Sequence, residues 1–468
     1  MAILFRTFST SWGYYVFDTS TNSVIVLNEF DFNELRKFEN SGFVNKNNVL
    51  ESYQERSFFK DVNIKDILHP DDEYLESLIS RKVEMVTLQL TQRCNLRCTY
   101  CFYSGRYGNR EHSDLDISFD IATKALDYAF SRSIDAEALS VGFYGGEPLL
   151  MIDLIKDCVS YIEEHYNGRR VQYNITTNGT LLTKNVYKYL KDKDFSILVS
   201  IDGPKPIHDS NRKFKNGTGS YDRIIKNLAS IEEFDSESVR RIGINAVIGS
   251  NRNDLCGDQI FSIEEFNNYS ALTLAFLSDT YIDEPYSYNN LLSVAHEKEV
   301  CKLLLFLAGR ISKSHVFKFI LSYIDIYNRE YRRIRRIENF PEVVHHSGPC
   351  VPGASRLLIN IFGDIFPCER VSELSLPMKL GTLDSGIDIS KARKILSPGR
   401  LIKEHCKNCW MILHCMSCAA HYDTLTELSA PKAISKCEGN QQQYEYLLKI
   451  ICFLKKNKYD FMLSEVSL

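Results

Sequence analysis

Apolar, β-branched runs alternate with amphipathic segments from residue 84 onward, and this rhythm limits the possible folds more than any other feature of the chain. The runs are EMVTLQLT, ALSVGFYG, VQYNITTN, FSILVSID, RIGINAVIG and ALTLAFLS. Between them lie segments such as SFDIATKALDYAFSRS and TKNVYKYLKDK, which carry apolar residues at helical spacing. Strands and helices that alternate in this way form right-handed β-α units around a buried parallel sheet. Six units predict an α/β fold, a partial TIM-like (β/α)6 barrel.

In such a fold, active sites lie on the loops at the C-terminal ends of the strands. Those loops carry the unusual residues of this sequence. Three thiols, C-x3-C-x2-C at 94–101, follow the first run. GGEP at 145–148 follows the second run, TNGT at 177–180 follows the third, and SIDGP at 200–204 ends the fourth. Each of these β-α units therefore contributes residues to the same end of the predicted barrel.

A chain of 468 residues is too long for one ordinary core. GYYVFDT and SVIVLN alternate like two strands joined by a polar turn, and NEFDFNELRKFEN then has apolar residues at helical spacing. Toward the C-terminal end the sequence becomes rich in turn-forming residues and cysteines. We expect an N-terminal module at 1–80, the barrel at 84–310, a helical bridge at 311–345 and a C-terminal domain at 346–468.

Charge and hydropathy exclude two classes of partner. The net charge of −4 offers no basic field for nucleic acid, and no apolar run approaches the length of a membrane helix. The first residues, MAILFRTFSTSWGYY, lack the pattern of a signal peptide, so a cytoplasmic protein is expected. The basic run NREYRRIRRI favours a solvated helix face over a docking strip for an acidic peptide.

Fourteen cysteines in a chain without an export signal favour metal ligation over disulfides, because the cytosol keeps thiols reduced. Cys158, Cys256, Cys301 and Cys452 lie outside the cysteine clusters, and we expect them to be buried packing residues.

The first triad, Cys94, Cys98 and Cys101, has three competing interpretations: a disulfide framework, a zinc site, or a metal cluster that another ligand completes. A structural zinc needs four closed ligands, and no cysteine or histidine nearby supplies a fourth. A 4Fe–4S cluster held by three thiolates leaves one iron open. That arrangement suits the activation of a small molecule.

C94-x3-C98-x2-C101 after the first strand, followed by GGEP after the second, resembles the radical S-adenosylmethionine superfamily. The resemblance implies that the open iron binds the amino and carboxylate groups of S-adenosylmethionine. It also implies that a reduced cluster cleaves the sulfonium to give a 5′-deoxyadenosyl radical, which abstracts hydrogen.

The resemblance also assigns a cofactor pocket. Tyr100 and Phe102 are expected to pack against adenine and shield the cluster, although ordinary core aromatics are the alternative. In Gly145-Gly146-Glu147-Pro148, the glycines allow close backbone approach and Glu147 receives the ammonium group.

Three further residues match cofactor-binding positions of that family. Ser200 and Arg212 are expected to hold the carboxylate and ribose, for which the arginine fork is suited. Asn178 is a candidate for the pocket, with an Asx-type turn as its competing interpretation.

Seven cysteines between residues 350 and 437 form a second constellation. Their order, C…G-x4-C, C-x2-C-x5-C-x2-C, C, resembles the SPASM extension, which binds two auxiliary 4Fe–4S clusters. Two zinc ribbons are the alternative on spacing alone. The chain departs from the family in having only Met416 and Ser417 before the penultimate ligand.

The ligation pattern of that family divides the seven thiols into two sets. One is complete, with Cys406, Cys409, Cys415 and Cys437. The other, Cys350, Cys368 and Cys418, is one ligand short. His345 or His346 could fill this gap. We favour an open site that binds a substrate thiolate, lowers its pKa and holds its sulfur near the carbon radical.

The N-terminal module resembles a winged-helix-like peptide-recognition element, in which a leader peptide adds a strand to a sheet edge. A structural cap is the alternative. We therefore expect a maturase that forms a cysteine thioether in a ribosomally made precursor peptide. It would use S-adenosylmethionine, three 4Fe–4S clusters, and a ferredoxin or flavodoxin reductant.

Other activities stay open at this point. Carbon–carbon crosslinking of a peptide and formylglycine formation by an anaerobic sulfatase-maturing enzyme are alternatives within the superfamily. A non-catalytic iron–sulfur electron carrier or a zinc scaffold is an alternative from another class. GGEP and Arg212 favour the enzyme, because a carrier needs no pocket for a carboxylate.

Overall fold

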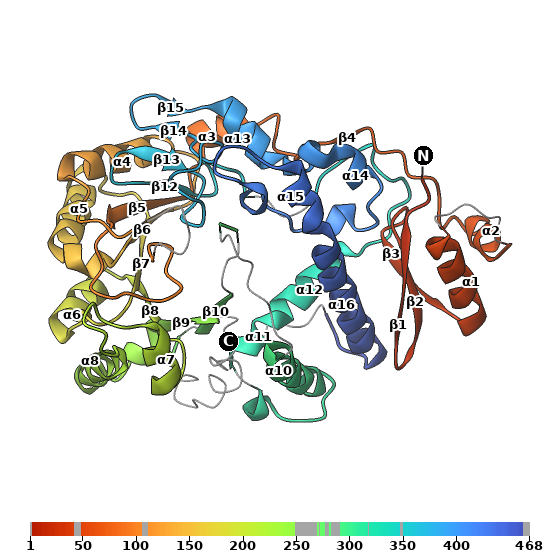
Figure 1. Cartoon of the computed structure of the whole chain (residues 1–468), viewed down its shortest axis with the longest axis horizontal. Coiled ribbons are helices and arrows are strands. Elements are labelled where there is room, and N and C mark those ends of the chain that lie inside the picture. The colour runs from red at the N-terminus through yellow and green to blue at the C-terminus, as the bar shows by residue number, and fades with distance from the viewer. Residues whose placement is uncertain are drawn as a thin grey trace.

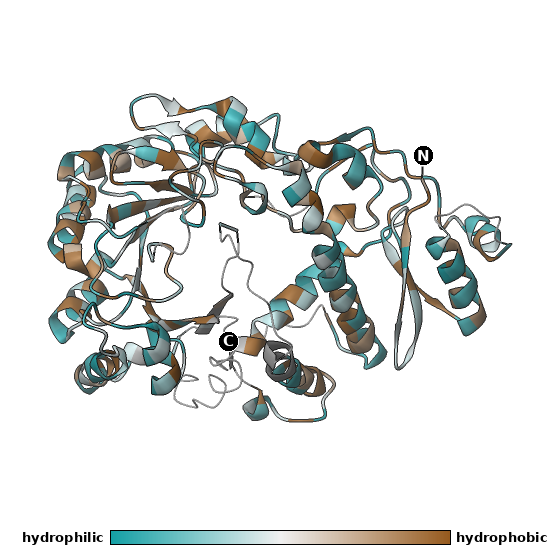
Figure 2. Cartoon of the chain, in the orientation of Figure 1, coloured by the Kyte–Doolittle hydropathy of each residue, from teal (hydrophilic) through white to brown (hydrophobic). Residues whose placement is uncertain are grey.

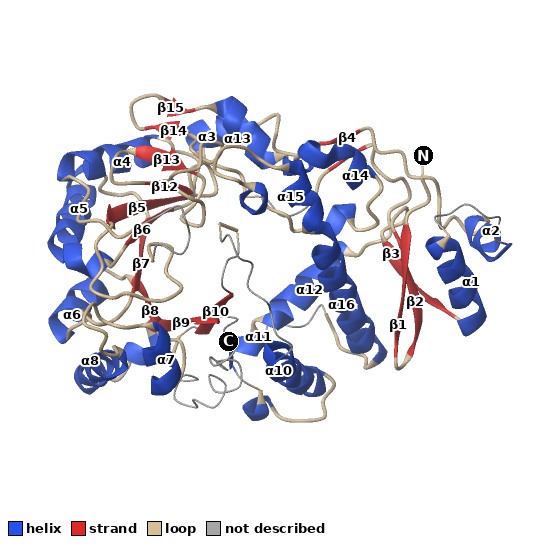
Figure 3. Cartoon of the chain, in the orientation of Figure 1, coloured by secondary structure: helices blue, strands red, loops and turns tan. Residues whose placement is uncertain are grey.

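The described residues form three sheets with surrounding helices (Figure 1). In this computed structural model the three-stranded N-terminal sheet and the large sheet lie at opposite ends, with α12 and α16 between them (Figures 1 and 3). The structure describes residues 2–41, 48–104, 111–248, 269–270, 272–276, 280–281, 291–316, 318–346 and 350–461.

The six strands predicted from the alternating runs are confirmed. They lie side by side, parallel and in chain order, and Figure 1 shows them along an arc with α4, α5, α6 and α8 on its outer side. The strands are β5 (Met85–Thr91), β6 (Leu139–Gly145), β7 (Val171–Thr177), β8 (Ser196–Ser200), β9 (Ile242–Ile248) and β10 (Leu272–Phe276). The helical elements among them are α4 (Phe119–Ser131), η1 (Pro148–Met151), α5 (Ile152–His165), α6 (Lys184–Asp192), α7 (Lys205–Asn211), α8 (Tyr221–Phe234) and η2 (Ser238–Arg240).

Side chains alternate along β5 between an apolar face and a polar face. Val86, Leu88 and Leu90 are fully buried in the main hydrophobic core, together with residues of the outer helices. Gln89 and Thr91 point to the opposite face and form side-chain hydrogen bonds there. Because side chains alternate across a strand, the inner face of the arc is polar.

Beyond β5 the sheet continues into the cysteine-dense region. β12 (Leu357–Ile359) pairs in parallel with β5, and β13 (Asp364–Phe366), β14 (Gly381–Thr382) and β15 (Gly386–Ile387) follow in antiparallel order. These strands have two or three residues each, too few to show a pattern in the sequence. The six parallel strands and these short strands of the cysteine-dense region therefore belong to one sheet.

The N-terminal module contains both predicted strands and a third strand, β1, that was not predicted. β1 (Phe5–Thr10) precedes β2 (Gly13–Asp18) and β3 (Ser23–Leu27), and all neighbours are antiparallel. α1 (Glu29–Asn40) matches its prediction, and α2 (Asn48–Gln54) follows it. β4 (Asp66–Ile67) pairs with β11 (Val343–Val344), and Leu75 of α3 (Leu75–Arg81) is buried in the barrel core.

The segment predicted as a helical bridge, 311–345, contains η4 (Lys313–His315), α11 (Lys318–Leu321) and α12 (Tyr323–Arg333), and β11 follows them. α10 (Leu291–Leu307) precedes this segment. Arg329 and Arg332 of the basic run are exposed on α12, as predicted for a solvated helix face, whereas Glu330 of the same run is buried. The later helical elements are α13 (Ile389–Leu396), η5 (Pro398–Ile402), α14 (Lys403–Lys407), η6 (Ile412–His414), η7 (Ala419–Tyr422), α15 (Ala430–Ser435) and α16 (Cys437–Lys456).

The four cysteines that were predicted to be buried packing residues differ in their exposure. Cys158 and Cys452 are buried, as predicted. Cys301 on α10 is exposed, so that prediction was wrong. Cys256 lies outside the described residues. Apolar and polar residues mix along the helices (Figure 2), and among the described segments no helix is long and apolar enough to cross a membrane.

Candidate functional site: thiol sets and a buried carboxylate network

The loop that carries Cys94, Cys98 and Cys101 is held against the short hairpin that follows α7. The backbone N–H of Arg97 donates to the Lys213 carbonyl (2.6 Å), and that of Thr99 donates to the Asn211 carbonyl (3.0 Å). A loop tied at alternate residues presents its side chains in a fixed arrangement.

The three thiols of this loop lie close enough to affect one another. Burial raises the pKa of Cys98 to about 12, and the neighbouring Cys101 and Cys94 thiols add to the shift. Burial also raises the pKa of Cys94 to about 12, with Glu147 and Cys101 contributing. A bound metal would reverse this, because coordination removes the thiol proton.

The donor set fits a cluster. Three soft thiolates on one loop are ligands that iron–sulfur centres use. Among the described residues, no three His, Cys, Asp or Glu side chains converge as the ligands of a single ion would. Cubane thiolates bind different irons, so they surround a cluster rather than a point. Cys94, Cys98 and Cys101 would hold it.

GGEP lies directly behind the thiol loop. A Cβ on Gly146 would meet the Arg93 carbonyl oxygen at 2.0 Å, so only glycine allows this backbone approach. The next residue, Glu147, is 1% exposed. Its carboxylate accepts from Thr177 Oγ1 (2.6 Å) and from the backbone N–H groups of Asn178 (2.8 Å) and Leu149 (3.0 Å).

Glu147 is both a structural cap and a buried anion. Pro148 begins η1, and the Glu147 side chain caps that turn. Burial raises the pKa of Glu147, whereas its three donors oppose the shift. Its role toward an ammonium group stays a prediction.

Asn178 adopts the Asx-type turn that competed with a pocket role. Its Oδ1 accepts from the Thr180 backbone N–H (3.0 Å), whereas its Nδ2 donates to Asn95 Oδ1 (2.9 Å). Asn95 directly follows Cys94. Asn178 therefore also braces the thiol loop, a contact that the sequence did not indicate.

A buried network joins Arg212 to the same loop. Asp202, with no exposed surface, accepts from Arg212 Nε (2.9 Å), from the Tyr100 hydroxyl (2.5 Å) and from the Val247 backbone N–H (3.0 Å). The Arg212 guanidinium also lies over the Tyr100 ring, 5.3 Å from its centroid. Because Nε is occupied, the terminal nitrogens of Arg212 are the part available to a carboxylate or ribose.

Sequence reasoning missed Asp202, although it lies in the SIDGP segment that marks the fourth loop. Ser200, predicted for the pocket, ends β8 and is 7% exposed, and Phe102 is half-buried beside the third thiol. Tyr100 was expected to pack on adenine, and the structure places its hydroxyl on Asp202.

We expect Asp202→Asn to weaken S-adenosylmethionine binding about tenfold, about 1.4 kcal/mol, because Arg212 loses the charge that orients it. Isothermal titration measures this. Asp209→Asn is the matched control, because Asp209 accepts one backbone N–H, from Tyr221 (2.9 Å), through an oxygen that asparagine retains. Equal dissociation constants for the two variants would contradict the assignment.

A second missed group lies on the inner face of the arc. Gln89, fully buried on β5, donates to Glu373 Oε1 (2.7 Å), and the Tyr103 hydroxyl donates to the same oxygen (3.0 Å). Tyr103 follows Cys101 by two residues, and Glu373 follows Cys368 by five. The only sequence signal was a glutamine inside an apolar run.

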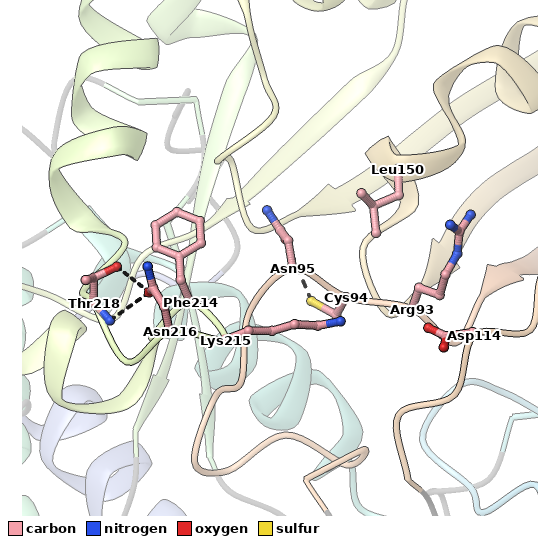
Figure 4. Close-up of a pocket in the computed structure, with 9 residues that line it drawn as sticks. All are labelled: Arg93, Cys94, Asn95, Asp114, Leu150, Phe214, Lys215, Asn216 and Thr218. Carbon is pink, nitrogen blue, oxygen red and sulfur yellow. Dashed lines mark hydrogen bonds between the residues drawn. The ribbon is translucent and has the colours of Figure 1, made fainter.

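A pocket of about 670 Å³ opens beside Cys94 (Figure 4). Lys215, which is exposed, extends toward Cys94 in this view, and Leu150 lies on the far side. None of the predicted cofactor-contacting residues lines this pocket. Its walls are Arg93, Cys94, Asn95, Asp114, Leu150, Phe214, Lys215, Asn216 and Thr218.

Four of the C-terminal cysteines affect one another's pKa. Burial raises the pKa of Cys406, and the thiols of Cys409, Cys415 and Cys437 raise it further. Burial likewise raises the pKa of Cys409 to about 12, with Cys415 and Cys437 contributing. All four therefore lie near one another.

The second set is separate. Burial raises the pKa of Cys368 to about 12, and the Cys418 thiol contributes. Burial raises the pKa of Cys418, to which Cys350 contributes. Their role as ligands stays a prediction.

The two histidines proposed as a fourth ligand lie elsewhere. His345 packs on His69, with ring centroids 4.5 Å apart, and contacts the Leu396 carbonyl oxygen (3.2 Å). His346 is 1% exposed beside Gly399, and neither of its ring nitrogens has a hydrogen-bond partner. Burial lowers the pKa of His346 to about 4, so this ring is neutral at pH 7.

Part of the chain matches a known protein family. Residues 88–256 match the family model of the radical SAM superfamily. The chain contains a radical SAM domain. Members of this family use S-adenosylmethionine and a 4Fe–4S cluster, in agreement with the thiol loop.

Similar radical SAM proteins include maturases. A cysteine-type anaerobic sulfatase-maturating enzyme of Clostridium novyi is 26% identical over 62% of this chain and 74% of its own length. The radical SAM cyclopropyl synthase TigE of Paramaledivibacter caminithermalis is 25% identical over 54% of this chain and 53% of its own. The structure of native anSMEcpe with bound AdoMet has a TM-score of 0.59 at 19% identity, over 78% of this chain and 99% of that one, which shows a common fold.

Proposed function

We propose that this radical SAM protein modifies a ribosomally made precursor peptide by joining a cysteine sulfur to a carbon as a thioether. One observation supports the proposal: Cys418 lies near both Cys350 and Cys368, the set that the resemblance leaves one cysteine short. A three-thiol set leaves a position for the sulfur of a substrate.

When bound, S-adenosylmethionine and its cluster supply a radical that removes hydrogen from the peptide. Formation of the C–S bond would break one C–H and one S–H bond: the adenosyl radical would take the hydrogen atom, the thiol would release a proton, and the remaining electron would pass to a cluster held by Cys406, Cys409, Cys415 and Cys437. Glu147 and Arg212 would bind and orient the cofactor. The buried position of Glu147 and Asp202 keeps water away from both contacts.

The N-terminal module supports a peptide substrate. Among the described strands, β3 pairs with β2 only, so one edge of the small sheet is open. Val26 on β3 is 72% exposed, and Phe30 in the first turn of α1 is 68% exposed. An open edge beside two exposed apolar side chains suits a leader peptide that adds a strand.

We expect Phe30→Asp to reduce peptide modification about tenfold or more, because a buried phenylalanine contributes about 1.5–3 kcal/mol. Co-expression with the precursor and mass spectrometry measure this. Phe234→Asp is the matched control, since Phe234 is exposed on α8 in another part of the molecule. Equal yields from both variants would contradict leader binding at β3.

Formylglycine formation is the second candidate function. The Clostridium novyi relative and the shared fold with anSMEcpe favour it. The match to anSMEcpe leaves about a fifth of this chain without a counterpart, which favours an added role such as leader binding. Incubation with a sulfatase-derived cysteine peptide separates the two functions: formylglycine removes the sulfur, whereas a thioether keeps it.

The deciding experiment is co-expression with small cysteine-containing reading frames from the neighbouring genome. A peptide that loses two hydrogens and one alkylatable thiol supports a thioether. The same loss with an unchanged thiol count would favour carbon–carbon crosslinking. A chain that binds no S-adenosylmethionine would be an electron carrier.

The remaining expectations belong to this proposal. Three 4Fe–4S clusters require about twelve irons per chain, and four or fewer would remove the auxiliary clusters. A ferredoxin or flavodoxin in the cytoplasm would supply the low-potential electron.

A further inference from the structure

The turn between β2 and β3 is unusually polar for a buried segment. Residues 18–22, with the sequence DTSTN, are all 6% exposed or less. Buried polar groups need hydrogen-bond partners, and partners outside the module would tie it to another part of the chain.

The first tie runs to the loop between Cys409 and Cys415. Thr19 Oγ1 donates to the Trp410 carbonyl oxygen (2.7 Å), and Trp410 directly follows Cys409. Phe17, at the end of β2, meets the Trp410 ring edge-on with centroids 5.8 Å apart. The module therefore contacts the backbone of the thiol loop itself.

Asn22 makes the second tie. Its backbone has a φ of 50°, the left-handed region that asparagine tolerates better than most residues. Its Nδ2 donates to the carbonyl oxygens of Arg333 (2.8 Å) and Arg335 (3.1 Å). Because these two acceptors orient the amide, Oδ1 faces His414 Nε2 at 2.7 Å and accepts from it.

His414 connects Asn22 to α12 and α16. It directly precedes Cys415, and its Nδ1 is hydrogen-bonded to Glu330. Glu330 also accepts from the Tyr444 hydroxyl (3.0 Å) on α16, the helix that Cys437 begins. One buried chain of hydrogen bonds thus links the turn to the residue before Cys415 and to α16, the helix that begins at Cys437.

We infer that Thr19 and Asn22 are positioning residues for the thiol set Cys406, Cys409, Cys415 and Cys437. The inference rests on the proposed role of these thiols as cluster ligands. β3 begins at Ser23, the next residue, so the edge proposed for the leader and the cluster loop share one turn. The N-terminal module is then part of the cluster site as well as a peptide-binding element.

The test compares two full-length variants. Asn22→Gly removes the amide and leaves the left-handed backbone accessible. Asn28→Gly is the matched control in the same module: Asn28 caps α1, and glycine is tolerated at that position. Thr19→Val, which removes one hydroxyl at nearly constant shape, gives a second variant if Asn22→Gly folds poorly.

The first measurements are iron content and the electron paramagnetic resonance spectrum after dithionite reduction. We expect Asn22→Gly to fall from about twelve to about eight irons per chain and to lose one cluster signal. Asn28→Gly should keep both. Wild-type iron and spectrum in Asn22→Gly, or equal losses in both variants, would overturn the inference.

A second measurement does not depend on any cluster. In the iron-free chain, iodoacetamide alkylation of Cys409 and Cys415 is followed by peptide mapping. We expect it to be about threefold faster in Asn22→Gly than in Asn28→Gly, because the loop loses a restraining hydrogen bond. Equal rates would overturn the positioning role. Four or fewer irons in the wild type would instead contradict the proposed auxiliary clusters.

Discussion

Replacement of Cys94 by alanine is expected to abolish reductive cleavage of S-adenosylmethionine. Cys94 is one of three thiols on the loop after β5, and loss of one ligand leaves a cluster with two. The effect should exceed the about 10- to 100-fold loss typical of changes around a metal's ligands. Anaerobic incubation with dithionite and chromatography of 5′-deoxyadenosine measures it.

Cys158→Ala is the matched control for that change. Cys158 is fully buried on α5 in the barrel core, so alanine there costs packing but removes no proposed ligand. We expect this variant to retain cleavage and about twelve irons per chain, whereas Cys94→Ala should hold about eight. Wild-type cleavage by Cys94→Ala would contradict the radical-generating role of the loop.

Replacement of Cys368 by alanine is expected to separate the two halves of the reaction. Cleavage of S-adenosylmethionine should stay within about twofold of wild type, because Cys368 belongs to a different thiol set from Cys94. The amount of crosslinked peptide should fall to background, because the two remaining thiols cannot hold a cluster that binds the substrate sulfur. Deoxyadenosine and modified peptide are quantified in the same reaction.

The control for Cys368→Ala is Cys452→Ala, a buried position on α16 outside both thiol sets. It should keep deoxyadenosine and crosslinked peptide in their wild-type ratio. Crosslinking by Cys368→Ala at the wild-type rate would contradict substrate binding at Cys350, Cys368 and Cys418, and would leave the first thiol loop sufficient for the whole reaction.

The six parallel strands could be predicted because each carries its signal within about eight residues of sequence. Val86, Leu88 and Leu90 are apolar because helices cover that face of β5, and the same logic repeats in the next strands. The thiol loop and GGEP could be placed at the rim for the same reason, since both directly follow a strand.

The short strands could not be predicted in this way. β12 has three residues and pairs with β5, which lies more than 250 positions earlier in the chain. The pairing of β12 with a distant segment leaves no local period in the sequence. β1 was also missed, although it pairs with β2, which begins three residues after β1 ends.

The sequence by itself determined which side chains stand at the ends of the strands and which spacings the cysteines have, because both follow from local order along the chain. Only the tertiary structure decided what those residues touch. Asp202 braces Arg212, Asn178 braces Asn95, and Asn22 reaches His414, 392 positions away. These contacts join segments that only the packing of the whole core brings together, so no local sequence pattern could predict them.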